Sequence, residues 1–117
     1  MKFNEINEFT KNFKRLSKKY KSLPNDLLEF KKVVSEFPCG NSKHFIILHS
    51  QEKIKIVKAR FFCRYLKGAS LRIVYAYKES EKIIDFIEIY SKNEQINENR
   101  ELIKAYLRQF NKEYGES

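Results

Sequence analysis

The sequence predicts an α+β domain, in which an N-terminal helical hairpin packs on a four-stranded antiparallel sheet and a C-terminal helix follows. Three observations predict this class. Apolar residues recur at helical spacing over residues 9–37, they alternate as in strands over residues 44–92, and helical spacing returns over residues 97–117. Because the links between the expected strands are short, the sheet should be a meander, with its helices on one face and its other face free.

Two helices are expected in the first third of the chain. The apolar stripe of the first helix consists of Phe9, Phe13, Leu16 and Tyr20. Pro24 suits the first turn of the second helix. The apolar stripe of that helix consists of Leu27, Phe30, Val34 and Phe37. Residues 3–6, before the first helix, fit either a brief strand or a lead-in to the helix.

Four strands are expected next, joined by turns. They fall within residues 44–49, 53–62, 70–77 and 83–92. Gly68 marks the turn between the second and third of them. Asn97 or Asn99 should cap the last helix, whose apolar stripe consists of Leu102 or Ile103, Tyr106 and Phe110. This helix should cover the sheet, although it could instead receive a segment of a partner protein.

Length and composition predict one domain that covers residues 1–117. The chain has 117 residues, of which 42% are hydrophobic and 15% aromatic, and this is typical of an ordered globular protein. Two cysteines, Cys39 and Cys63, are too few for a disulfide framework, so a reduced, cytoplasmic protein is expected. No apolar run approaches the length of a membrane span, so no contact with a membrane is predicted.

The formal net charge of +9 is the most informative part of the composition. Most of the positive excess lies in residues 1–60, whereas residues 93–117 are nearly neutral. A basic surface indicates an anionic partner, with nucleic acid as the first choice and an acidic protein as the second. A lysine-rich chain with solvated helix faces would give the same number without any partner.

Several kinds of site find little support in the sequence. The cysteines and histidines have no recognised spacing for metal ligands, so no metal site is expected. There is no glycine-rich phosphate loop and no nucleophile elbow. Asp85 and Glu88 lie at an odd spacing on one expected strand, so they should face opposite sides and not form a carboxylate pair.

Cations lie on strands that should otherwise pack a core. Lys58 and Arg60 are two residues apart and therefore project from one face. Arg72 lies on the next strand, and Tyr90 and Lys92 share a face at the end of the last one. If the strands pair in chain order, these groups converge at one end of one face. Converging cations repel unless an anion lies between them, so a phosphate site is predicted there. Strand ends that emerge into solvent are the simpler alternative.

At these residues the sequence resembles the RelE/ParE superfamily of toxins from type II toxin–antitoxin systems, especially its RelE- and HigB-like members. The family pattern is a K-x-R strand, a turn, an x-R-[VIL]-[IV]-Y strand and a strand that ends in I-Y-x-K. The matching segments here are residues 58–60, 71–75 and 89–92. The resemblance extends from about Phe9 to Leu107, and the order of helices and strands also matches the family.

The resemblance implies a small basic ribonuclease that enters the A site of the ribosome, contacts ribosomal RNA and cuts the mRNA there. A cognate antitoxin protein, encoded in the same operon, would neutralise it. In the RelE-like branch the ribose 2′-OH attacks the adjacent phosphate, and the products are a 2′,3′-cyclic phosphate and a 5′-OH end. Neither a metal nor another cofactor is expected.

The residues of the site can be given roles in that reaction on chemical grounds. Arg72 can stabilise the pentavalent phosphorane, and Arg60 can clamp a phosphate. Lys58 is crowded by two arginines, which favour its neutral form, so it is the candidate base. Tyr90 can stack on a base or orient the 2′-OH. Lys92 can protonate the leaving 5′-oxygen or bind a phosphate.

Further expectations concern the surroundings of the site. Arg64, Lys67 and Lys55 are expected to contact RNA without taking part in the reaction. Some family members use a His or Glu near the C-terminal end as acid or base, and here no histidine follows His49, which could substitute. The main alternative function is that of a ParE-like toxin that binds and poisons DNA gyrase, which has no need of converging cations. A degenerate or solitary toxin that survives as a binding module is a third possibility.

Overall fold

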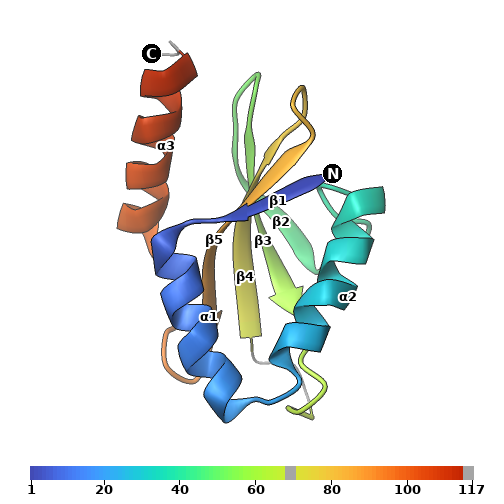
Figure 1. Ribbon diagram of the computed structural model, residues 1–117. Coiled ribbons are helices and arrows are strands. Elements are labelled where there is room, and N and C mark those ends of the chain that lie inside the picture. Colours follow the sequence, from blue (N-terminus) through green and yellow to red (C-terminus); the bar gives the residue numbers. More distant parts are fainter. Residues whose placement is uncertain (68–70, 115–117) are drawn as a thin grey trace.

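The computed structural model describes residues 1–67 and 71–114, and these form three helices and five strands (Figure 1). In chain order they are β1 (Lys2–Glu5), α1 (Asn7–Lys19), α2 (Leu23–Glu36), β2 (Phe45–Ser50), β3 (Lys55–Phe61), β4 (Leu71–Lys78), β5 (Ile83–Ser91) and α3 (Arg100–Tyr114). The helical hairpin, the four strands after it and the C-terminal helix are confirmed. Gly68, predicted in a turn, lies outside the described residues.

The sheet has five strands, not the predicted four, in the order β1-β5-β4-β3-β2. Strands β2 to β5 form the expected antiparallel meander. The difference is β1, which pairs with β5 in parallel and makes the sheet mixed. Its four residues, KFNE, are too few to show a strand period, so only the pairing with β5 identifies them as a strand.

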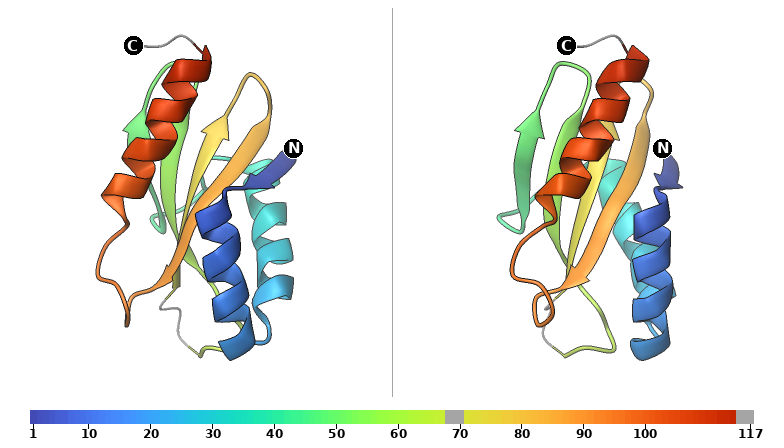
Figure 2. Two further views of the ribbon diagram at one scale, coloured as in Figure 1. Left: turned by 60° about the vertical axis from the view of Figure 1, so that its left-hand side comes forward. Right: turned by 90° about the vertical axis from the view of Figure 1, so that its left-hand side faces the viewer.

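Helices cover both faces of the sheet, so the prediction of one free face is wrong. Helices α1 and α2 pack on one face and α3 packs on the other (Figure 2). Ile103 and Phe110 of α3 lie against a second apolar cluster that contains Val74 and Ile87. The segment LRIVYAY of β4 reflects this arrangement, because a strand that is buried on both faces reads as a continuous apolar run.

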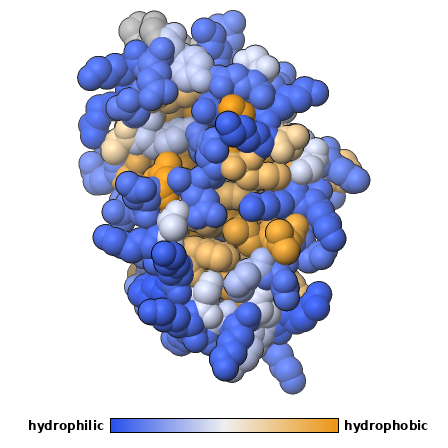
Figure 3. All heavy atoms as spheres, viewed as in Figure 1, coloured by the Kyte–Doolittle hydropathy of each residue, from blue (hydrophilic) through white to orange (hydrophobic). Residues whose placement is uncertain are grey.

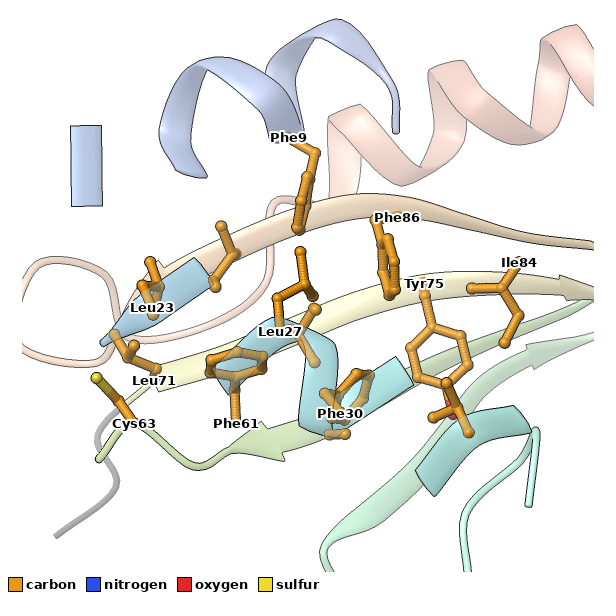
Figure 4. Packing of buried hydrophobic residues seen from close by; sticks show 14 of the residues in the cluster. Phe9, Leu23, Leu27, Phe30, Phe61, Cys63, Leu71, Tyr75, Ile84 and Phe86 are labelled. Carbon is orange, nitrogen blue, oxygen red and sulfur yellow. The ribbon is translucent and has the colours of Figure 1, made fainter. Parts of the chain in front are cut away.

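The larger core lies between the α1–α2 hairpin and the sheet (Figure 4). The ring centroids of Phe9 and Phe86 are 5.3 Å apart, and those of Phe30 and Phe61 are 5.6 Å apart. Of the predicted second stripe, only Phe37 is exposed, because α2 ends at the residue before it. On the face shown in Figure 3, hydrophilic residues cover most of the surface, with hydrophobic patches between them. No helix of the described ranges is long and apolar enough to cross a bilayer.

A buried polar network joins β1, β4, β5 and α3. Asp85 of β5 accepts hydrogen bonds from the hydroxyl of Tyr106 at 2.6 Å and from the amide of Asn4 at 3.1 Å. The ammonium of Lys78 lies 3.2 Å from the same carboxylate. Burial and the hydrogen bond to Asp85 raise the pKa of Tyr106. The network therefore fixes α3 against the edge of the sheet that contains β1.

Strand β5 contains a bulge that changes which side chains face α3. Val74 pairs with Glu88 and Tyr75 with Phe86, so Ile87 has no partner of its own. As a result Glu88, like Asp85, faces α3, and its Oε1 accepts the backbone N–H of Asn99 at 2.9 Å. The prediction that Asp85 and Glu88 face opposite sides is wrong, because simple alternation does not hold across a bulge.

Candidate active site

Three of the predicted site residues form a row across the sheet, at the lower end in Figure 1. Arg60 of β3 pairs in register with Arg72 of β4, and Arg72 pairs with Tyr90 of β5. Directly opposed residues project from the same face, which here is the face that α3 covers further along. We refer to Arg60, Arg72 and Tyr90 as the cross-strand row. Arg60 is exposed, Arg72 is half-buried and Tyr90 is buried.

Tyr90 is a protonated phenol at neutral pH. Its burial, followed by the nearby negative charges of Glu98 and Glu88, raises its pKa to about 12, although the charge of Arg72 acts in the opposite direction. Its hydroxyl can therefore donate a hydrogen bond to an oxygen of a substrate, beside the Arg72 guanidinium. Arg72 itself donates from Nη1 to the carbonyl oxygen of Leu71 at 3.0 Å, which leaves other N–H groups of the guanidinium for a ligand.

Lys58 lies on the same face as the row but is paired with an acidic residue. Its Nζ is 2.9 Å from Oε1 of Glu98, which precedes α3 and whose side chain is 4% exposed. Arg100 lies 3.4 Å from the other carboxylate oxygen. Burial acts to raise the pKa of Glu98, but the hydrogen bond from Lys58, the bond to its own backbone and the two positive charges lower it overall.

This ion pair changes the role expected for Lys58. The prediction of a base rests on crowding by arginines alone, whereas the structure adds a carboxylate in direct contact. Since the Nζ of Lys58 donates to this carboxylate, crowding by arginines alone does not describe its surroundings. No local pattern in the sequence marks Glu98, because it lies in a loop and its partner is 40 residues away.

The remaining predicted residues lie around the row or away from it. Lys92 is exposed just beyond β5, and Arg64 and Lys67 are exposed on the loop after β3. Lys55 is not brought to the site, because it lies at the other end of β3 and on the other face, near Cys39.

His49 is tied to α3 and not to the row. Its Nε2 is 2.7 Å from Oε1 of Gln51, and Gln51 donates to Asn111 of α3 at 3.0 Å. His49 and Glu98 both line a small cavity of about 240 Å³ at the base of α3. Within residues 1–67 and 71–114, no three His, Cys, Asp or Glu side chains form a group that could hold a metal ion.

The arrangement is that of an α+β protein with an α1–α2 hairpin on one face of its sheet and a row of basic and phenolic groups at the sheet's end. This fold is RelE-like. The structure is similar to a chain of the crystal structure of the archaeal RelE–RelB complex from Pyrococcus horikoshii OT3, with a TM-score of 0.60 and 17% sequence identity over 78% of this chain and 93% of that chain. No model of a protein family matches the sequence, and no curated protein matches it either.

Proposed function

We propose that this protein is the toxin of a toxin–antitoxin pair and that it acts as a ribosome-dependent mRNA endonuclease. The observation that carries the proposal is the cross-strand row of Arg60, Arg72 and Tyr90 on a RelE-like fold. The net charge of +9 supports a polyanionic substrate. The complex of RelE with RelB in the similar structure supports a cognate antitoxin as the protein partner.

In the proposed reaction the ribose 2′-OH attacks the adjacent phosphate and the bond to the 5′-oxygen breaks. The proton of the 2′-OH passes through water to the leaving 5′-oxygen, which gives a 2′,3′-cyclic phosphate and a 5′-OH end. Arg72 and Arg60 hold the phosphate and stabilise the additional negative charge of the phosphorane. Tyr90 donates a hydrogen bond as a neutral phenol. Lys58 acts as a cation that contacts phosphate, and Lys92 and Arg64 bind the neighbouring RNA backbone.

The proposal is tested by Arg72→Ala. Removal of a preorganised group that stabilises developing charge commonly lowers a rate by about 100- to 1,000-fold. We therefore expect the variant to lose growth arrest on induction, and to lose mRNA cleavage in a reconstituted translation system, with its thermal melting little changed. Arg108→Ala is the matched control, because it removes the same charge from an exposed position on α3. An Arg72→Ala variant that still cuts mRNA at the rate of the wild type would refute the site, and growth arrest with stalled DNA gyrase and intact mRNA would support the ParE-like alternative.

A further inference from the structure

A groove with a volume of about 690 Å³ opens at Arg60, between α2 and the start of β2, on the face of the sheet that the α1–α2 hairpin covers and not on the face from which the cross-strand row projects. Its walls are mainly apolar and consist of Phe30, Val33, Phe45 and Phe62. Arg60 and Arg64 also line it, together with the carboxylates of Asp26 and Glu29, so its charged groups balance. The groove is large enough to hold a nucleoside-sized ligand.

Arg60 belongs to both features. It is the outermost member of the cross-strand row, and it also lines the groove. A strand of RNA that is bound at Arg60 and passes around the end of β3 would place a neighbouring nucleotide at the mouth of the groove.

A buried carboxylate holds the part of the β3–β4 loop that lines the groove. Asp26 of α2 is 6% exposed, and its Oδ2 accepts the backbone N–H of Arg64 at 3.1 Å and the hydroxyl of Ser22 at 2.7 Å. The Ser22 hydroxyl in turn accepts the backbone N–H of Tyr65 at 2.8 Å. These bonds fasten the loop to the N-terminal end of α2, so Phe62 and Arg64 are positioned before any ligand arrives.

The exposed side chains of the groove suit a nucleobase. The side chain of Phe62 is 69% exposed, and Arg60 and Arg64, two residues to either side of it, also line the groove. Aromatic rings that stack on bases, together with arginines that contact the backbone, are the usual means by which proteins bind single-stranded RNA. The carboxylates of Asp26 and Glu29 offset these two guanidinium groups within the groove, so the preference for a polyanion rests on the chain's net charge of +9.

We propose that the groove is a nucleobase subsite, in which the base next to the phosphate on the cross-strand row stacks on Phe62. The inference rests on the proposed function, because it requires RNA on the row. It assigns Phe62 to stacking on the bound base and Arg64 to the phosphate that flanks this base. Asp26 and Ser22 are positioning residues, which act through the loop backbone.

The test uses a fluorescent oligoribonucleotide of about five nucleotides, with 2′-O-methyl groups that prevent 2′-OH attack, and measures its binding by anisotropy. Each nucleotide is replaced in turn by an abasic one. Loss of one stacked base should weaken binding to the wild type by about 5- to 150-fold at a single position. Phe62→Ala should show a similar loss with the intact oligonucleotide and no further loss with that abasic one, whereas Phe62→Tyr should retain affinity. Ile46→Ala, which truncates an exposed apolar side chain outside the groove, should bind as the wild type does.

Failure of this inference can be told apart from failure of the proposed function. If Arg72→Ala abolishes mRNA cleavage while the abasic profile is flat, or while Phe62→Ala binds at full strength, the endonuclease stands and the subsite is refuted. Absence of oligonucleotide binding by the wild type also refutes the subsite. If Phe62→Ala binds RNA normally but no longer binds the product of the adjacent reading frame, the groove is a protein-docking surface and the inference is overturned.

Discussion

Replacement of Glu98 by Gln should lower the stability of the fold and at the same time strengthen RNA binding. The two effects have opposite signs because Glu98 stabilises Lys58 in the free protein and competes with RNA phosphate for it. Glu98 accepts from Lys58 at 2.9 Å, and the two side chains are 4% and 20% exposed, respectively.

The size of the stability change follows from this geometry. At an effective dielectric constant of about 20, two unit charges at that distance attract by roughly 6 kcal/mol, but desolvation opposes most of this. A hydrogen bond that involves charged groups contributes a net of about 1.5–3 kcal/mol. Since Gln retains a carbonyl oxygen as acceptor, we expect Glu98→Gln to cost about 1–2 kcal/mol, which corresponds to a fall in Tm of about 3–10 °C for a chain of this length.

The gain in RNA affinity follows because Lys58, when it is no longer paired with Glu98, can neutralise an RNA phosphate. One further neutralised phosphate changes the slope of log K against log salt by roughly 0.7–0.9, so affinity near 0.1 M salt should rise about 5- to 8-fold. Glu101→Gln is the control, because it removes the same charge from an exposed position that pairs with Lys104 at 3.6 Å. Urea unfolding and oligonucleotide anisotropy give the two measurements. A fall in affinity in parallel with stability would show that Glu98 assists RNA binding and does not compete with it.

The same ion pair gives the stability a dependence on pH. The pKa of Glu98 in the folded protein is lower than its ordinary value of 4.5, so the unfolded chain takes up the proton first as the pH falls. The stabilisation is therefore complete above pH 4.5 and is lost as the pH falls through the lower, folded value. Urea midpoints between pH 6 and pH 3 should decline more steeply for the wild type than for Glu98→Gln, and equal slopes would contradict this account.

Two further substitutions test the fold. Tyr106→Phe should cost about 1.5–2.5 kcal/mol, because Asp85 loses a hydrogen bond within a buried network; urea unfolding measures this, and a similar cost for the exposed Tyr65→Phe would argue against it. Gly40→Ala should cost at least about 2 kcal/mol, because Gly40 has a φ of +89° and the added methyl group would overlap the ring of Phe45. An unchanged Tm for Gly40→Ala would show that this turn rearranges freely.

The parts of the fold with a local signal could be predicted from the sequence. The period of apolar residues places α1, α2 and α3, and the predicted cap of α3 is present, because Asn99 Oδ1 accepts the backbone N–H of Leu102 at 3.1 Å. Strand β1 could not be predicted with the same certainty, since its partner β5 lies about 80 residues away in the sequence. The continuous apolar run of β4 is the pattern of a strand that is buried on both faces. It therefore predicts a covered second face, in contrast to the expectation of one free face.

The candidate site also has residues that a local pattern in the sequence predicts and residues that no such pattern predicts. Alternation along a strand places Lys58 and Arg60 on one face, and pairing in chain order brings Arg72 and Tyr90 beside Arg60. Glu98 could not be foreseen, because a loop has no period and its contact with Lys58 depends on how α3 docks. The alternation that unites Lys58 and Arg60 also places Lys55 on the other face, so any contact of Lys55 with RNA lies outside the cross-strand row.

Ile87, the residue of the β5 bulge that has no partner in β4, determines which side chains of the strand face the core. Before it, even-numbered side chains such as Phe86 enter the core beneath α1 and α2, and after it odd-numbered ones such as Ile89 do. Deletion of Ile87 would therefore rotate Tyr90 out of the row and into that core, and would exchange the environments of every residue to the end of the strand. In a comparison with a relative whose β5 lacks this bulge, an alignment that allows no one-residue gap would match inward-facing with outward-facing positions, and would lose the correspondence of Tyr90.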